Sequence, residues 1–214
     1  MQVTSLHKDI DILQLMHGDS SLRSIYGAGC IENPKVMFVF MNPTARNISA
    51  HVHWKGLRAP WLGTKNVWNI FHELGLVSKD TYERIRNIKS EEWSENFCHS
   101  VYSELEKQKV FVTNLAKCTQ LDARPLKDTI FRNYLELMLK EIALIKPKHI
   151  ISFGNQVSSI LLSKPISVST YNGTKAEVLT IDGRNFNVYP TYYPVGQGRR
   201  NMPLAIKRIK GILK

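Results

Sequence analysis

The sequence predicts an α/β fold, a three-layer αβα domain around a central, mostly parallel four-stranded sheet. Three short apolar runs rich in β-forming residues occupy residues 36–40, 110–113 and 149–153, and polar or turn residues follow each of them at once. Such runs are typical of buried parallel strands. Helical patterns lie between them, and strands that alternate with helices favour a layered sheet.

The helical patterns have recognisable ends. Residues 67–74 form one, and residues 128–145 form a long amphipathic helix that Pro147 closes after a last turn bearing a lysine. The most polar stretch, residues 78–100, is compatible either with two short surface helices or with an insertion.

The C-terminal part of the chain predicts a hairpin and a helix. Residues 177–181 and 185–189 flank Asp182 and Gly183, and Asp-Gly is a strong signal for a tight hairpin turn. A final basic helix, residues 203–213, is expected to close the domain.

Length and composition indicate one globular domain over residues 1–214. The chain is 43% hydrophobic and 22% charged, which is ordinary for a folded protein, and its net charge of +11 favours a polyanionic partner. The three cysteines form no closely spaced pair, so a reducing compartment fits best. No export signal or membrane segment is visible. We expect a cytoplasmic monomer, associated with the nucleoid if the protein is prokaryotic.

The chemistry is expected where the strands end, because ligands of open α/β sheets bind beyond the carboxyl ends of the strands. The segments there read MNPT (residues 41–44), NLAKC (114–118), GNQ (154–156) and PTYYP (190–194). This set is rich in amides and poor in fixed charge, and the chain has no GxSxG elbow and no Walker A loop. Amides that donate and accept at once suit the edge of a neutral base.

These segments resemble motifs of the uracil-DNA glycosylase superfamily. FMNPT at residues 40–44 resembles the first motif of the mismatch-specific and single-strand-selective branches, Gly-hydrophobic-Asn-Pro-Gly. APWLG at 59–63 is similar to the next segment, which carries an aromatic residue for stacking on the base. VTNLAKC at 112–118 and PKHIISFG at 147–154 resemble the third motif and the following strand of the iron-sulfur branch. The similarity spans residues 36–214 and depends on the order and spacing of the motifs.

The resemblance implies a monofunctional DNA N-glycosylase that flips a base out of single- or double-stranded DNA, in base excision repair of DNA damage. By resemblance, Asn42 would hold the attacking water and Asn114 would read the flipped base. Trp61 would stack on that base, with Met41 beside it. The expected DNA contacts are made by polar and basic side chains, those of Lys117, Arg199, Arg200 and Asn201.

The chain departs from the superfamily at three points. Phe40 and Thr44 replace the glycines of the first motif, and the cysteine ligands of an iron-sulfur cluster are absent, with Arg132 near one expected position. We therefore expect no cluster, no metal and no other cofactor. The third departure is Tyr193-Pro194-Val195 in place of His-Pro-Ser, so that Tyr193 stands where the superfamily has the stabiliser of the departing base.

The sequence leaves the activity open in two respects. Uracil is the default substrate, but hypoxanthine, mismatched thymine and modified cytosine remain alternatives. Because the usual histidine is missing, the chain could instead be a nucleic-acid-binding module without catalysis, or could act on a non-uracil base, for example in defence against foreign DNA. A nucleotide or nucleoside enzyme would better suit a neutral or acidic chain.

Overall fold

The computed structural model describes residues 2–214, apart from the side chain of Gln197. The helices are α1 (His7–His17), α2 (Trp68–Glu73), α3 (Lys79–Asn87), α4 (Glu95–Lys107), α5 (Asp128–Asn133), α6 (Leu135–Ile145), α7 (Asn155–Leu161) and α8 (Met202–Leu213). The strands are β1 (Ala28–Gly29), β2 (Val36–Phe40), β3 (Val110–Asn114), β4 (His149–Phe153), β5 (Glu177–Ile181) and β6 (Arg184–Thr191). Short 3₁₀ helices are η1 (Val3–Leu6), η2 (Ile48–Ala50), η3 (Ser90–Glu92), η4 (Val168–Thr170) and η5 (Gly196–Asn201).

The strands form one sheet in the order β1-β3-β2-β4-β6-β5. The four inner strands run parallel, as the sequence predicts, while β1 and β5 pair antiparallel at the two edges. The expected strand number of four is therefore wrong for the whole sheet, which has six. The hairpin of β5 and β6 forms as predicted, and Asp182 and Gly183 at its turn both have positive φ, 49° and 76°. The two-residue β1 is too short to give a periodic signal.

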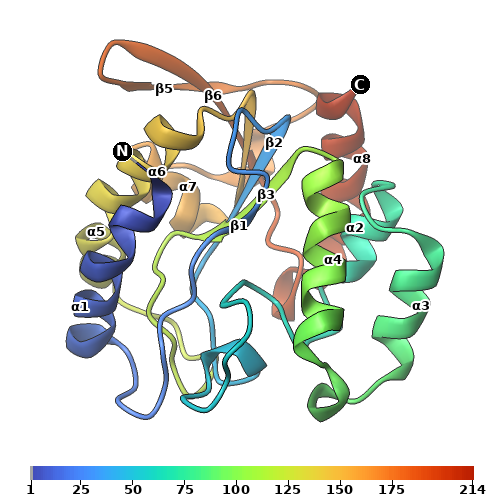
Figure 1. Cartoon of the computed structure of the whole chain (residues 1–214). Coiled ribbons are helices and arrows are strands. Elements are labelled where there is room, and N and C mark those ends of the chain that lie inside the picture. Colours follow the sequence, from blue (N-terminus) through green and yellow to red (C-terminus); the bar gives the residue numbers. More distant parts are fainter. Residues whose placement is uncertain (1) are drawn as a thin grey trace.

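Helices cover both faces of the sheet (Figure 1). Alternate side chains of β2 point to opposite faces, as the strand period of two requires. Phe38 and Phe40 pack in one core with residues of α2, α3, α4 and α8, while Met37 and Val39 pack in a second core with residues of α5, α6 and α7. Through Leu6 and Ile10, the N-terminal segment adds a smaller cluster against α6. The predicted αβα architecture is confirmed.

Several helices differ from expectation. The helix predicted over residues 128–145 is divided at Tyr134, whose backbone (φ −90°, ψ −10°) ends α5 and begins α6. The polar segment 78–100 forms α3, η3 and the start of α4, so it is helical as one alternative proposed. Helix α7 begins directly after Gly154, so Asn155 and Gln156 of the predicted GNQ segment lie in its first turn. Within residues 2–214, no helix has the length and apolar character needed to cross a bilayer.

The carboxyl ends of the four parallel strands lie at one edge of the sheet, at the bottom of Figure 1. The long connections after β2 and β3 gather at this edge, and η5 follows β6. The segments that the sequence analysis selected for chemistry are therefore brought to the same end of the molecule.

Candidate active site

A cavity of about 310 Å³ lies at the carboxyl edge of the sheet, and we call it the base cavity. This volume is at the lower end of the range of small-molecule sites. Its walls come from the segments that follow β2, β3 and β6. The lining residues are Met41, Asn42, Pro43, Thr44, Arg46, Asn47, Trp61, Thr64, Asn66, Asn114, Ala123, Arg124, Pro125, Tyr193, Val195 and Gly196. All five residues predicted to act on the base, namely Met41, Asn42, Trp61, Asn114 and Tyr193, line this one cavity.

The two asparagines come together because β2 and β3 are adjacent parallel strands. Phe40 is the register partner of Asn114, and the Leu115 amide donates to the Phe40 carbonyl at 2.8 Å. Asn42, two residues beyond Phe40, donates from Nδ2 to the Pro43 carbonyl at 3.1 Å. Asn114 is only 3% exposed, and its Oδ1 is buried without a hydrogen-bond partner among the described residues. A buried, unpaired acceptor is costly, so such an atom in a cavity wall indicates a ligand.

Trp61 is held in the cavity wall with a strained backbone. Its φ of +66° lies in the left-handed region, which costs a non-glycine residue roughly 1–3 kcal/mol. The Trp61 carbonyl accepts hydrogen bonds from Trp68 Nε1 at 3.2 Å and Thr64 Oγ1 at 2.8 Å, which hold this conformation. The indole packs edge-on against Phe40, with ring centroids 5.0 Å apart. Strain retained in a cavity wall is consistent with a functional position.

Tyr193 closes the cavity from the β6 side. Its ring packs edge-on against Phe40, with ring centroids 6.5 Å apart. Phe40 therefore contacts both aromatic rings of the cavity wall, those of Trp61 and Tyr193. Burial raises the pKa of the Tyr193 phenol, which therefore stays protonated and can donate a hydrogen bond. Gly198 lies against the Tyr193 carbonyl so closely that an added Cβ would sit 1.9 Å from its oxygen. A glycine is needed here for the chain to turn into η5.

The predicted contact of Lys117 with DNA is wrong. The Lys117 side chain is 1% exposed and its Nζ lies 2.9 Å from Oε2 of Glu141, an equally buried carboxylate on α6. The same Nζ donates to the Asn114 carbonyl at 3.1 Å and to Thr113 Oγ1. A buried lysine with these partners cannot reach a phosphate, and it instead fixes the backbone from which Asn114 enters the base cavity.

The other predicted DNA contacts lie on η5. Arg199 and Arg200 are exposed and Asn201 is partly exposed. Arg199 also lines a neighbouring cavity of about 570 Å³, together with Lys65 and Arg86. That cavity shares Asn66, Val195 and Gly196 with the base cavity, so cations lie directly beside the amide-rich site.

Five polar residues of the base cavity lie outside the predicted segments, namely Arg46, Asn47, Thr64, Asn66 and Arg124. Arg46 comes two residues after the first motif, so its proximity to that motif was an available signal. Conversely, the segment that begins α7 does not line the base cavity: Asn155 accepts from the Val168 amide at 2.9 Å, and Gln156 donates to Asp128 at 2.8 Å. These two amides stabilise neighbouring loops.

The chemistry available in the base cavity is that of amides, hydroxyls and two guanidinium groups, those of Arg46 and Arg124. Among the described residues that line it there is no Asp, Glu, His or Cys, while three asparagine amides besides Asn114, two hydroxyls of threonine and the phenol of Tyr193 are present. Such a site offers hydrogen bonds and stacking surfaces but no strong acid or base near neutral pH. It suits a reaction in which the enzyme positions groups and stabilises charge.

Comparison with known proteins agrees with this geometry. A search of curated proteins gives no match. The family model for the uracil DNA glycosylase superfamily matches residues 26–210, which include every strand and every residue named above in the base cavity. The first motif, the aromatic segment and the third motif thus fall inside the matched region. The chain belongs to the uracil-DNA glycosylase superfamily.

Proposed function

We propose that this protein is a monofunctional DNA glycosylase, which hydrolyses the N-glycosidic bond of a base flipped out of DNA, with uracil as the default base. Members of the superfamily are generally DNA glycosylases. The observation that carries the proposal is the unpaired, buried Oδ1 of Asn114 in a cavity that also contains Asn42, Trp61 and Tyr193. A base edge satisfies that acceptor, and flipping is how enzymes bring a base out of the stack.

Recognition of the base falls to Asn114 and Trp61 in this proposal. The Asn114 amide pairs with an N–H and a carbonyl of the base, a pattern that a pyrimidine such as uracil presents. Trp61 supplies an aromatic face, and stacking of a base on an aromatic side chain is worth about 1–3 kcal/mol. Met41 lines the same cavity and contributes apolar contact.

Hydrolysis requires stabilisation of positive charge on the sugar and negative charge on the leaving base. Asn42 positions a water, whose oxygen attacks the sugar carbon as the bond to the base nitrogen breaks and the base leaves with the electron pair. The proton that the water loses passes through solvent to the departing base anion. An amide accepts no proton near neutral pH, so Asn42 acts through positioning. The protonated Tyr193 phenol donates a hydrogen bond to an oxygen of the departing base.

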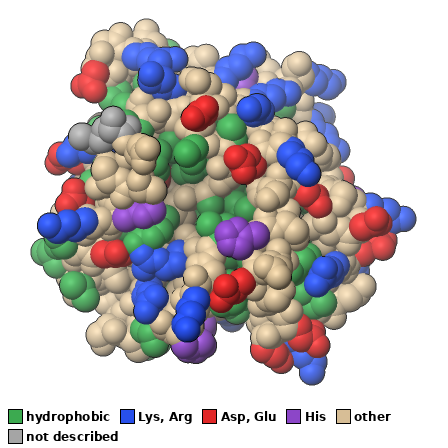
Figure 2. Space-filling view, viewed as in Figure 1, with side chains coloured by type: hydrophobic (Ala, Val, Ile, Leu, Met, Phe, Trp, Pro, Cys, Tyr) green, Lys and Arg blue, Asp and Glu red, His purple; other side chains and the backbone are tan. Residues whose placement is uncertain are grey.

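Binding of DNA is supported by the charge of the molecule. The net charge is +11, and Figure 2 shows Lys and Arg side chains mainly around the outer parts of one face, with acidic side chains among them. Arg199, Arg200 and Asn201 stand on η5 next to Tyr193, where they meet the strand as the base leaves the duplex. Such contacts to phosphates are strongly salt-dependent.

The test is a glycosylase screen over single- and double-stranded oligonucleotides that carry uracil, hypoxanthine, a thymine mismatch or a modified cytosine. Excision is read as strand cleavage after alkaline treatment. We expect at least one base to be removed, and Asn42→Ala to slow the single-turnover rate by about 10²-fold while DNA binding is retained. Binding of DNA without excision of any base would contradict catalysis and support the alternative, a DNA-binding module in which Tyr193 replaced the catalytic histidine.

A further inference from the structure

A second cavity, of about 740 Å³, lies beside the N-terminal helix, and we call it the N-terminal cavity. It is lined by residues of α1, of the segment before β1 and of the segment 52–58. Three of these carry a fixed positive charge, Arg23, Lys55 and Arg58, against the single carboxylate of Asp11. The function proposed for the base cavity uses none of them.

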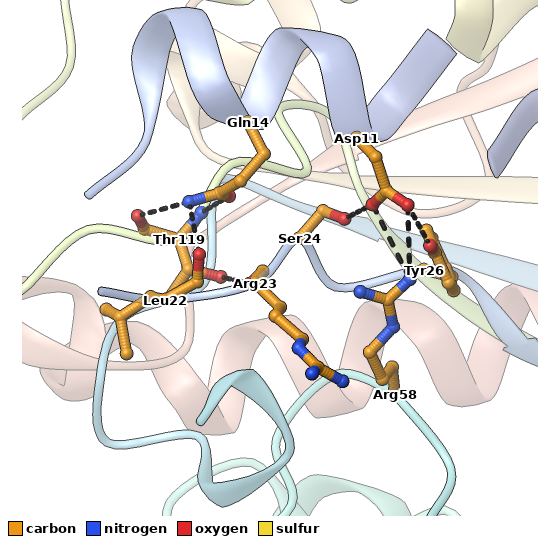
Figure 3. Close-up of polar contacts among 8 residues, drawn as sticks. All are labelled: Asp11, Gln14, Leu22, Arg23, Ser24, Tyr26, Arg58 and Thr119. Carbon is orange, nitrogen blue, oxygen red and sulfur yellow. Dashed lines mark hydrogen bonds and ion pairs between the residues drawn. The ribbon is translucent and has the colours of Figure 1, made fainter. Parts of the chain in front are cut away.

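The Asp11 carboxylate is already occupied by protein donors (Figure 3). It accepts hydrogen bonds from Ser24 Oγ, from the Tyr26 hydroxyl at 2.8 Å and from Arg58 at 3.4 Å. Because it also neutralises part of Arg58, little of its charge remains for Arg23 or Lys55. The cavity therefore keeps an excess of positive charge.

Arg58 is held in one orientation. Its guanidinium lies 4.0 Å from the centre of the Tyr26 ring, while one edge faces Asp11. Burial lowers the pKa of Arg58; the charge of Asp11 opposes this effect, and the nearby charge of Arg23 adds to it. A guanidinium fixed on two sides, next to a second cation, is preorganised for an anion with several oxygens.

Arg23 belongs to a segment that is rigidly attached to the rest of the protein (Figure 3). Gln14, which is 4% exposed, donates from Nε2 to the Leu22 carbonyl at 3.2 Å and accepts from the Thr119 amide at 2.7 Å. The Arg23 amide donates to the Ala50 carbonyl at 2.7 Å, and its own carbonyl accepts from Thr119 Oγ1 at 2.6 Å. The exposed Arg23 side chain thus projects from fixed backbone, which lowers the entropic cost of binding a ligand.

The N-terminal cavity lies at the same edge of the sheet as the base cavity. The segment before β1 reaches the carboxyl end of β3 because these two strands are antiparallel. Arg58 lines one cavity and Trp61 the other, and the Cα atoms of these two residues, three positions apart, are separated by at most roughly 11 Å. Successive phosphates of a strand in a duplex are roughly 3.4 Å apart along the axis. When a base of the strand occupies the base cavity, a flanking phosphate of the same strand is therefore close enough to reach the N-terminal cavity.

We propose that the N-terminal cavity binds a backbone phosphate of the DNA strand whose base enters the base cavity, through Arg23, Lys55 and Arg58. The inference rests on the proposed function, since it takes the base cavity to hold a nucleotide of the same strand. It assigns a second contact point to the substrate, separate from η5. A strand held at a phosphate beside the flipped nucleotide is fixed in register.

The test uses the double variant Arg23→Ala/Lys55→Ala, which removes two exposed side chains and leaves the Asp11–Arg58 pair intact. Its matched control is Lys148→Ala/Arg184→Ala, which makes the same change in charge at exposed positions near the amino ends of β4 and β6. Fluorescence anisotropy measures binding of an oligonucleotide in which methylphosphonates neutralise one phosphate at a time.

We expect one phosphate position near the modified base at which neutralisation weakens binding to the wild type about tenfold. The Arg23→Ala/Lys55→Ala variant should bind the unmodified oligonucleotide about tenfold more weakly than the wild type. Neutralisation of that one phosphate should not weaken its binding further. The control variant should respond to each neutralised phosphate as the wild type does. An unchanged profile in the Arg23→Ala/Lys55→Ala variant would overturn the proposal.

A competition arm with inorganic phosphate distinguishes a strand phosphate from a free one. Inorganic phosphate could bind the wild type but not the Arg23→Ala/Lys55→Ala variant, while the two proteins respond alike to every methylphosphonate. That result would assign the cavity to a free phosphate and overturn the contact with the DNA strand. Excision is not read in this assay. If the glycosylase screen finds no excision but binding still depends on that one phosphate, the proposed function is refuted and the phosphate contact is not.

Discussion

At the scale of single residues, the candidate active site contains three residues with unusual hydrogen bonding, backbone conformation or residue type. Asn114 has a buried acceptor without a partner, and Trp61 keeps a left-handed backbone. Tyr193 supplies a phenol where the superfamily resemblance expects an imidazole. The first two are local departures from what stability alone favours, and all three residues line one cavity.

The hydroxyl of Tyr193 is the first point to test. Tyr193→Phe keeps the ring packed against Phe40 but removes the donor to the leaving base, so we expect the single-turnover rate to fall by about 10²-fold. Single-turnover excision of the substrate found in the screen measures this. Tyr193→His is the companion variant, and a gain of uracil excision by it would indicate that the tyrosine acts chiefly as a steric filter. Equal rates for Phe and Tyr would exclude the donor role.

Base selection is expected to depend on Asn114. Asn114→Asp replaces an amide that both donates and accepts with a carboxylate that only accepts, so the preferred base should change while binding to undamaged DNA stays within about twofold of the wild type. The ratio of kcat/KM values for two bases from the screen measures the change. An unaltered ratio would mean that another group reads the base.

At the scale of elements, the position of Asn114 depends on a contact between the end of β3 and helix α6. Lys117 and Glu141 form a buried ion pair, and Lys117 also holds the Asn114 carbonyl. Removal of one partner leaves the other charge buried and unpaired. The pair thus connects a helix on one face of the sheet to the residue proposed to read the base.

We expect Glu141→Gln and Lys117→Met each to lower the free energy of unfolding by about 3–5 kcal/mol, because each leaves a buried charge uncompensated. The double variant Lys117→Met/Glu141→Leu should recover a large part of that loss. Urea unfolding of the three variants measures this. If the single and double variants are destabilised alike, the ion pair is not the cause.

At the scale of the whole molecule, stability depends on histidines that fold in their neutral form. Burial lowers the pKa of His7, with the charge of Arg58 next in importance, and burial also lowers the pKa of His149. A group with a lowered pKa in the folded state contributes stability that is present above its unfolded pKa, about 6.5, and is lost as the pH falls below it.

We therefore expect the urea concentration at the unfolding midpoint to decrease as the pH is lowered from 7.5 to 5.5. His7 stacks on Tyr26 with ring centroids 3.6 Å apart, and His7→Phe retains a stacked ring without a titrating group. This variant should lose less stability than the wild type over the same pH interval. An identical pH dependence in the two proteins would show that His7 does not contribute.

The sequence by itself determined three of the four parallel strands, the hairpin at Asp182 and Gly183, and five of the residues that line the base cavity. Strong apolar runs, turn residues and the order of motifs are local signals, and the elements that they predict are present in the folded protein. The parallel order then places the strand ends at one edge, so residues selected from motifs converge there.

Only the tertiary structure decided the states of individual polar groups. Lys117 looked like a phosphate contact because its charge is visible in the sequence, whereas its burial against Glu141 depends on how α6 packs on the sheet. The break at Tyr134 and the N-terminal cavity, which joins Arg23 to Arg58, also arise from contacts between segments far apart in the chain. Burial and charge pairing are properties of the assembled fold, and no local pattern encodes them.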